Sequence, residues 1–256
     1  MENDEPQACA KIVSCSPVAN EKIKRRQLIK SAVQIFPAAG LLAASIASTN
    51  AVSAENSQED VTPVEDLMRE HGALNRLLII YEFILNKISA DKTMSPKPLI
   101  EAATLMREFV ENYHEKTEET YLFPRFEKAG KLQDLVAVLK NQHDAGRQLT
   151  GLILSGAKDL EGGNAMKKVL IVAYLNQFVR MYRPHEARED TILFPAFKTI
   201  VSPAEYKELG EKFEDEETRL FGKGGFEKNV DKIAAIEKDL GIYDLAQFTP
   251  KDIPSK

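Results

Sequence analysis

One phrase occurs twice in the chain, as HEKTEETYLFPRF over residues 114–126 and as HEAREDTILFPAF over residues 185–197. The two copies match at eight of thirteen positions. In each copy a glutamate follows the histidine by four residues, which gives the pairs His114–Glu118 and His185–Glu189. Residues four apart lie on the same face of an α-helix, so each pair is predicted to point in one direction from a helix.

The two remaining histidines stand at a matching distance before the two copies. His71 precedes His114 by 43 residues, and His143 precedes His185 by 42 residues. This spacing indicates a duplicated helical hairpin with one histidine on each of four helices. Apolar residues at helical spacing predict these helices at about 63–90, 97–122, 132–154 and 165–200.

Four long amphipathic helices with short connections predict an all-α fold. The expected architecture is an up-down-up-down four-helix bundle over residues 62–201. Pro124 is expected to stop or kink the second helix, and Pro184 to distort the fourth helix.

A C-terminal helical extension is predicted over residues 202–256. It begins with a second capping box at Ser202 and contains helices to about residue 221 and over about 226–240. The extension is expected to pack on the bundle.

The first 54 residues differ in character from the rest. Arg25 and Arg26 precede an apolar tract rich in Ala, Ser and Leu, which ends in small residues at Ala54. This order indicates an export signal, and the paired arginines resemble the bacterial twin-arginine type. The tract contains Pro37 and several polar residues, which make it a poor permanent membrane span. We therefore expect a removed signal peptide over 1–54 and a linker over 55–61.

The apolar positions of the helices place the repeated His and Glu residues on the buried side. Four imidazoles and two ionised carboxylates in the centre of a bundle would be unstable unless cations compensated the charge. Mixed nitrogen and oxygen ligands suit iron, and six side chains are enough for two irons bridged by carboxylates. Both cysteines lie in the expected signal, so no thiolate ligand would remain. The alternative is a structural bundle whose histidines are ordinary core or surface residues.

The spacing excludes two other helical metal motifs. The zinc-protease motif H-E-x-x-H needs a histidine where this chain has Glu118 or Glu189. Ferritin-like di-iron bundles use Glu-x-x-His, with the glutamate first and a spacing of three.

The full pattern, a histidine, then His-x-x-x-Glu, repeated once and with Leu-Phe-Pro after each glutamate, resembles the hemerythrin-like (HHE cation-binding) family. The resemblance covers about residues 64–200. It implies a non-haem di-iron centre with an oxo or hydroxo bridge. The implied ligands are His71, His114, Glu118, His143, His185 and Glu189. Members of the family carry oxygen, sense oxygen or iron, repair iron–sulfur clusters, break down peroxide or react with nitric oxide.

Three positions bear on function when the chain is compared with the oxygen carriers of that family. Those proteins have a fifth histidine four residues after the third-helix histidine, where this chain has Arg147. Two accessible irons would favour reaction with peroxide, nitric oxide or oxygen over reversible oxygen carriage. Tyr121, whose counterpart in the second copy is Ile192, is a candidate ligand, hydrogen-bond donor or redox neighbour, or else a buried core tyrosine. Asp190 stands where the carriers use an aspartate ligand, whereas regular helix geometry favours Glu189.

Four further residues have expected positions around the centre. Asn75 and Arg147 each follow a histidine by four residues and are expected to support the ligands. Glu115 and Glu186 follow their histidines directly and are expected to face solvent.

The expected protein is therefore a periplasmic di-iron protein that meets the membrane only during export. It would bind or process oxygen, peroxide or nitric oxide, as a peroxidase-like, catalase-like or nitric oxide-processing enzyme or as a non-catalytic sensor or iron store. The net charge of −5 and the lack of a basic stripe argue against a nucleic-acid partner. The sequence does not specify the oligomeric state.

Overall fold

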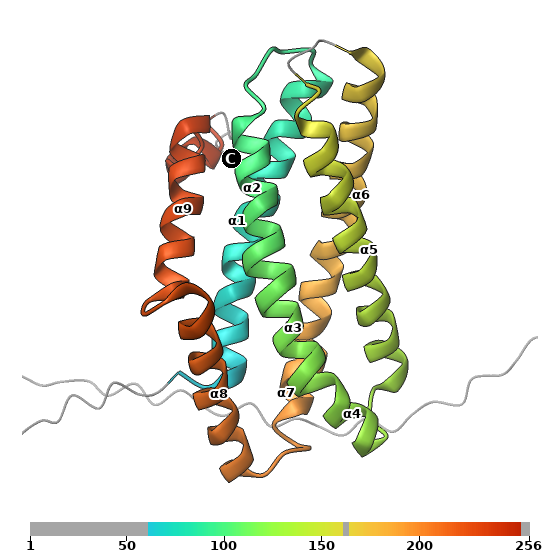
Figure 1. Ribbon diagram of the computed structural model, residues 1–256, viewed down its shortest axis with the longest axis vertical. Coiled ribbons are helices and arrows are strands. Elements are labelled where there is room, and N and C mark those ends of the chain that lie inside the picture. Colours follow the sequence, from blue (N-terminus) through green and yellow to red (C-terminus); the bar gives the residue numbers. More distant parts are fainter. Residues whose placement is uncertain (1–60, 161–163, 252–256) are drawn as a thin grey trace, which may run out of the picture. The chain divides into compact units, whose positions relative to one another are not determined.

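The computed structural model describes residues 61–160 and 164–251, and every regular element in these ranges is helical (Figure 1). The predicted signal peptide over 1–54 lies outside the described residues, as does all but the last residue of the predicted linker. Among the helices that the structure describes, none combines the length and the apolar character needed to span a membrane.

Four long helical segments lie side by side in Figure 1. The first is α1 (Pro63–Ser89) and the third is α5 (Gln133–Ala157). The second consists of α2 (Lys97–Leu105), η1 (Met106–His114), α3 (Glu115–Thr117), η2 (Glu118–Leu122) and α4 (Phe123–Ala129). The fourth consists of α6 (Ala165–Arg188), η3 (Glu189–Leu193) and α7 (Phe194–Phe197).

The first segment begins where its sequence predicts. Thr62 caps α1 by accepting a hydrogen bond from the Glu65 amide at 3.4 Å, and the Glu65 carboxylate accepts one from the Thr62 amide at 3.0 Å. Pro63 occupies the first turn, where its missing N–H group has no intrahelical partner to lose.

The second segment continues past Pro124 to Ala129, so the prediction that this helix ends at about Leu122 is wrong. The elements η1, η2 and η3 are π-helical, which means that their backbone bonds span five residues. The turn η2 directly precedes α4, whose second residue is Pro124. Proline is tolerated in the first turn of a helical element, because the backbone N–H group that it lacks is not needed for a hydrogen bond there. Gly130, with φ of +64°, ends the segment.

The C-terminal part forms α8 (Pro203–Phe221), α9 (Gly225–Leu240) and the short 3₁₀ helix η4 (Leu245–Phe248). Both long helices pack on α1 (Figure 1). In addition, α8 contacts η1 and α9 contacts α2. A half-buried ion pair fixes this packing, because Arg76 Nε lies 2.9 Å from Glu237 Oε1.

Two clusters of buried apolar side chains stabilise the helices. In α1, Leu67 belongs to one cluster and Leu74 to the other, and His71 lies between them. In each of the other three segments, the buried apolar residues before the histidine likewise belong to one cluster and those after it belong to the other. The four histidines therefore share one polar layer between two apolar layers.

Candidate metal centre

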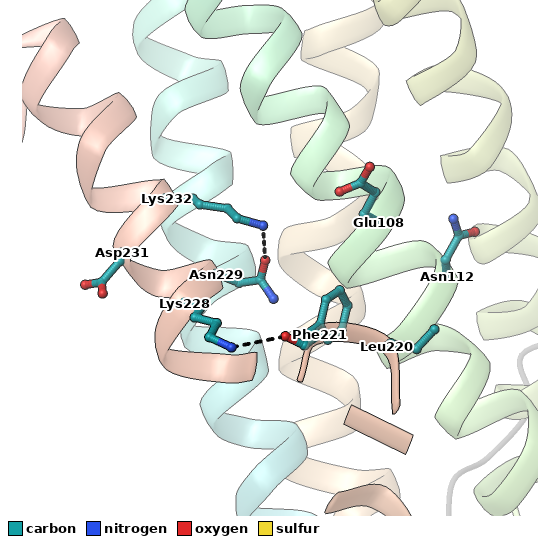
Figure 2. Close-up of a pocket in the computed structure, with 8 residues that line it drawn as sticks. All are labelled: Glu108, Asn112, Leu220, Phe221, Lys228, Asn229, Asp231 and Lys232. Atoms are coloured by element: carbon teal, nitrogen blue, oxygen red, sulfur yellow. Dashed lines mark hydrogen bonds between the residues drawn. The ribbon is translucent and has the colours of Figure 1, made fainter. Parts of the chain in front are cut away.

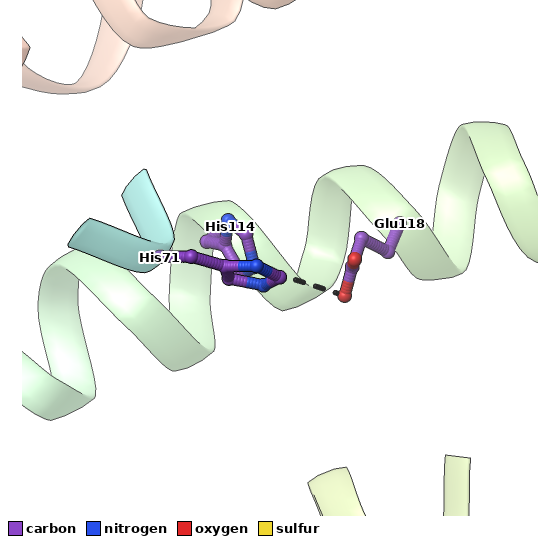
Figure 3. Close-up of side chains that lie close together, drawn as sticks. All are labelled: His71, His114 and Glu118. Carbon is purple, nitrogen blue, oxygen red and sulfur yellow. Dashed lines mark ion pairs between the residues drawn. The ribbon is translucent and has the colours of Figure 1, made fainter. Parts of the chain in front are cut away.

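The six sequence-predicted ligands come together in this polar layer and are all buried. They form two groups, each with one donor atom per residue and all donor atoms within 4.8 Å of one another. The first group is His71, His114 and Glu118 (Figure 3), and the second is His143, His185 and Glu189.

The two glutamates lie between the groups. Glu118 Oε2 is 3.9 Å from His114 Nε2 in its own segment and 3.5 Å from His143 Nε2. Glu189 Oε2 is 3.1 Å from His185 Nε2 in its own segment and 3.4 Å from His71 Nε2. Each carboxylate thus reaches a histidine of the other hairpin, as a ligand shared by two metal ions would.

The outer nitrogen of every histidine faces a side-chain oxygen from a different helix. Such a partner fixes the ring orientation and directs Nε2 toward a metal. The four contacts are His71 Nδ1 with Asp190 at 2.8 Å, His114 Nδ1 with Glu70 at 2.6 Å, His143 Nδ1 with Glu119 at 3.1 Å and His185 Nδ1 with Gln142 at 2.9 Å.

The inner atoms of the layer fit a cation. Within the described residues, His71 Nε2 and both carboxylate oxygens of Glu118 and of Glu189 are buried without a hydrogen-bond partner. Buried polar atoms of this kind are normally satisfied, so a cation between them would supply the partner that these atoms lack.

The protonation states of His114, His143 and Glu118 bear on metal binding. Burial lowers the pKa of His114 well below its ordinary value, and burial lowers the pKa of His143 to about 4. These rings are therefore neutral at pH 7, which is the form that binds a metal. Burial and the charge of Glu189 raise the pKa of Glu118 well above its ordinary value, so the ionised carboxylate needs a nearby cation.

Glu115 and Glu186 are buried at 1% and 3% exposure, so the prediction that they face solvent is wrong. The Tyr182 hydroxyl donates to Glu115 Oε1 at 2.5 Å, and Arg147 Nη2 lies 2.8 Å from Glu115 Oε2. In the other half of the layer Asn75 donates to Glu186. Each glutamate follows a ligand histidine, so these contacts hold the ligand helices in place.

Arg147 occupies the position of the fifth histidine of the oxygen carriers, but its guanidinium points to carboxylates. Besides Glu115 it contacts Glu119 at 2.5 Å and Asp144 at 3.2 Å. Because Glu119 is the partner of His143, Arg147 supports that histidine through Glu119. Asn75 donates to the His71 carbonyl at 3.2 Å and to Glu186.

Tyr121 lies away from the two ligand groups. Its ring packs against Phe213 of α8, with ring centroids 5.5 Å apart, beside the apolar cluster that contains Leu67. The phenylalanines of the repeated Leu-Phe-Pro lie closer to the histidines. Phe123 stacks on His143 and Phe194 stacks on His71, with centroid distances of 5.5 and 5.3 Å.

Three of the outer partners, Glu70, Glu119 and Gln142, are not among the residues predicted from the sequence. The repeat contains the signal that would find them. Glu119 and Asp190 are equivalent positions, five residues after His114 and His185, and Glu70 and Gln142 directly precede the other two histidines.

A surface hollow of ≈ 720 Å³ lies away from the histidine layer, between η1 and the turn from α8 to α9 (Figure 2). Glu108 and Asn112 line one side, and Lys228 and Lys232 the other. Lys228 donates to the Phe221 carbonyl at 3.3 Å, so part of its polar lining is already paired. None of the six ligands lines this hollow.

The comparisons with known proteins agree with the geometry. The profile of the hemerythrin HHE cation binding domain matches residues 62–197. Three uncharacterized proteins, one from Mycobacterium bovis and two from strains of Mycobacterium tuberculosis, are each 42% identical to the chain over 236 residues. These alignments cover 89% of this chain and 91% of each relative. No solved structure matches the chain.

Proposed function

Because the chain belongs to the hemerythrin HHE cation-binding family, we propose that its histidine layer binds two iron ions and that this centre binds or processes oxygen, peroxide or nitric oxide. The observation that carries the proposal is the shared position of Glu118 and Glu189, each within 4 Å of two histidines of different hairpins. In this proposal the four long segments form an up-down-up-down bundle, which the contacts of α6 with both α1 and α5 and of α2 with α5 support.

Iron suits this donor set, since imidazole and carboxylate ligands with positions left for a small molecule are typical of non-haem iron proteins. When bound, the metal supplies redox chemistry and a place for the small ligand. The chain contributes rigidity: the outer partners hold each imidazole in one tautomer with Nε2 directed inward. Phe123 and Phe194 cover two of the rings and exclude water from that side.

The position of Arg147 favours turnover over reversible carriage. Its guanidinium is engaged with Glu115 and Glu119, so this residue does not supply a fifth ring to one metal. The two metal positions then have equal numbers of protein ligands, and both keep room for peroxide, oxygen or nitric oxide. A role as a sensor or iron store predicts the same metal content without turnover.

We also propose that the protein acts in the bacterial periplasm after export by the twin-arginine route. The support is the sequence Lys24-Arg25-Arg26 before the apolar tract that ends at Ala54. A protein exported in the folded state can receive its iron before it crosses the membrane. Replacement of Arg25 and Arg26 by lysine should leave the protein inside the cell in a fractionation experiment. Equal export of this variant and of the native chain would refute the route.

The function is tested with iron-loaded protein. We expect two irons per chain and loss of metal in His114→Ala and His185→Ala. Tyr121→Phe serves as the control, since Tyr121 packs against Phe213, and its iron content and absorption spectrum should not change. The loaded protein is then mixed separately with hydrogen peroxide, nitric oxide and oxygen. Turnover of peroxide or nitric oxide supports an enzyme, whereas a reversible oxygen spectrum without turnover supports carriage. Fewer than one iron per chain in the native protein refutes the proposal.

A further inference from the structure

Both histidines of the first group, His71 and His114, have a carboxylate behind them. Asp190 lies 2.8 Å from His71 Nδ1, and Glu70 lies 2.6 Å from His114 Nδ1. Within the described residues, neither carboxylate forms an ion pair with a lysine or an arginine. Glu70 is also buried, so its charge is little screened. With a cation bound at the inner nitrogens, the first group is thus backed by two carboxylates whose charge the chain does not compensate.

The second group has one carboxylate behind its two histidines. That carboxylate, Glu119, lies 3.1 Å from His143 Nδ1, and Lys116 and Arg147 each contact it at 2.5 Å. The other partner is the neutral amide of Gln142, which lies 2.9 Å from Nδ1 of the other histidine. The second group is therefore backed by one negative and two positive charges.

The same imbalance continues in the residues around these partners. Asn75 and Arg147 are equivalent positions of the repeat, each four residues after a histidine. Asn75 donates to the buried carboxylate of Glu186, whereas Arg147 places its guanidinium 2.8 Å from the buried carboxylate of Glu115. An arginine thus stands on the side of His143 where a neutral amide stands in the other half.

Outer partners of this kind change the properties of a bound metal. A carboxylate behind an imidazole raises the basicity of the inner nitrogen, and a neutral amide does so less. Nearby negative charge stabilises a cation, and it stabilises three positive charges more than two. The inner ligands cannot produce such a difference, because each group has two histidines and one glutamate. The first group should therefore bind a metal ion more tightly and favour its higher oxidation state.

We propose that the two metal positions are inequivalent: the first group fills before the second, and its iron is the first to be oxidised. This inference rests on the proposed di-iron centre and adds an order to it. When one electron leaves a doubly ferrous centre, the ion at the first group becomes ferric and the ion at the second group stays ferrous. The residues that set this order are Glu70 and Asp190 on one side and Gln142, Lys116 and Arg147 on the other.

Metal titration of two histidine variants tests the order of filling. His71→Ala and His143→Ala change equivalent residues of the two groups. Calorimetry with Fe²⁺ under anaerobic conditions should show that His143→Ala retains the tighter of the two binding steps of the native chain and that His71→Ala loses it. The reverse result, or equal effects of the two variants, would overturn the order.

An added carboxylate tests whether the outer partners cause the difference. Gln142→Glu gives the second group the partner that it lacks, so the weaker binding step should become tighter. The matched control is Gln133→Glu, which adds the same charge at an exposed position of α5 and should leave both steps unchanged. Circular dichroism verifies that each variant is folded. Equal effects of Gln142→Glu and Gln133→Glu would contradict a role of the outer partners.

Mössbauer spectroscopy tests the order of oxidation and does not depend on turnover. The first position is filled with one equivalent of the Mössbauer-active iron isotope, and the second is filled with a silent isotope. One equivalent of ferricyanide then removes one electron per centre and is itself reduced to ferrocyanide. The active isotope should give a ferric spectrum, and the reverse order of loading should give a ferrous one.

Two outcomes separate a failure of this inference from a failure of the proposed function. A ferrous spectrum after the first order of loading, or the same spectrum after both orders, would overturn the inequivalence while the di-iron centre stands. Fewer than one iron per native chain would refute the di-iron centre itself, and the inference with it.

Discussion

Asp190 Oδ1 lies 2.8 Å from Nδ1 of His71, on the outer side of that ring, while the neighbouring Glu189 reaches the inner nitrogen of the same histidine at 3.4 Å. Two adjacent residues of one π-helical turn thus contact the two nitrogens of one imidazole from a different helix. In the proposed di-iron centre, Glu189 would therefore be the shared ligand and Asp190 the residue that supports His71.

The first prediction separates these two carboxylates. Glu189→Gln removes a charge shared by both metal positions, so most of the bound iron should be lost. Asp190→Ala removes an outer partner and should weaken iron binding by about 10–100-fold without abolishing it. Iron affinity measured by competition with a chelator distinguishes the two effects. The opposite order of effects would show that Asp190 is the shared ligand.

The second prediction concerns Arg147. Arg147→Met removes the guanidinium that pairs with both Glu115 and Glu119, which should lower the free energy of unfolding by about 3 kcal/mol. Arg183→Met is the control, because Arg183 and Glu82 form an exposed pair and its loss should change stability by about 1 kcal/mol or less. Urea unfolding of the two variants provides the comparison. Equal losses would contradict a buried ionic role for Arg147.

The third prediction compares two glycines of α5. A Cβ at Gly146 would overlap the Tyr182 hydroxyl and lie 2.9 Å from two of its ring carbons, so Gly146→Ala should displace the phenol from Glu115. The expected loss of stability is about 1–3 kcal/mol. A Cβ at Gly151 would make only an ordinary contact at 3.7 Å, and Gly151→Ala should stabilise the helix by about 0.5–1 kcal/mol. Thermal unfolding that gave the same sign for both variants would refute this packing.

The fourth prediction is a pH dependence of the metal-free protein. Burial and the charges of Glu70 and Glu217 raise the pKa of Asp66 to about 7. A carboxyl whose pKa is higher in the folded state stabilises the fold below its unfolded pKa of about 4, and this stabilisation is lost as the pH rises to 7.

Asp66→Asn removes that titration. The stability of the variant relative to the native chain should therefore increase from pH 4 to pH 7 and remain constant above pH 7. Denaturant unfolding at a series of pH values measures the difference. A constant difference over the whole range would show that Asp66 has an ordinary pKa.

The helices and the six inner residues could be read from the sequence because both depend on local periodicity. Helical spacing places His114 and Glu118 on one face, and the capping box at Thr62 defines the start of α1. The π-helical turns could not be predicted, since the apolar periodicity of the sequence does not distinguish a five-residue from a four-residue hydrogen-bond register. Tertiary contacts decide the rest.

The burial of Glu115 and Glu186 shows why tertiary contacts matter. A residue directly after an inward histidine is turned away from it, and in an isolated helix it would face water. Here neighbouring helices cover both glutamates. Tyr182 of α6 and Arg147 of α5 contact Glu115, and Asn75 of α1 contacts Glu186.

The reciprocal reach of Glu118 to His143 and of Glu189 to His71 has a consequence for the origin of the centre. A hairpin with this arrangement is self-complementary: two identical copies related by a twofold axis would complete each other's ligand sets. A short ancestral chain could therefore have formed the centre as a homodimer before fusion joined the copies. Once fused, the copies were free to differ, and the equivalent positions Asn75 and Arg147 carry different residues.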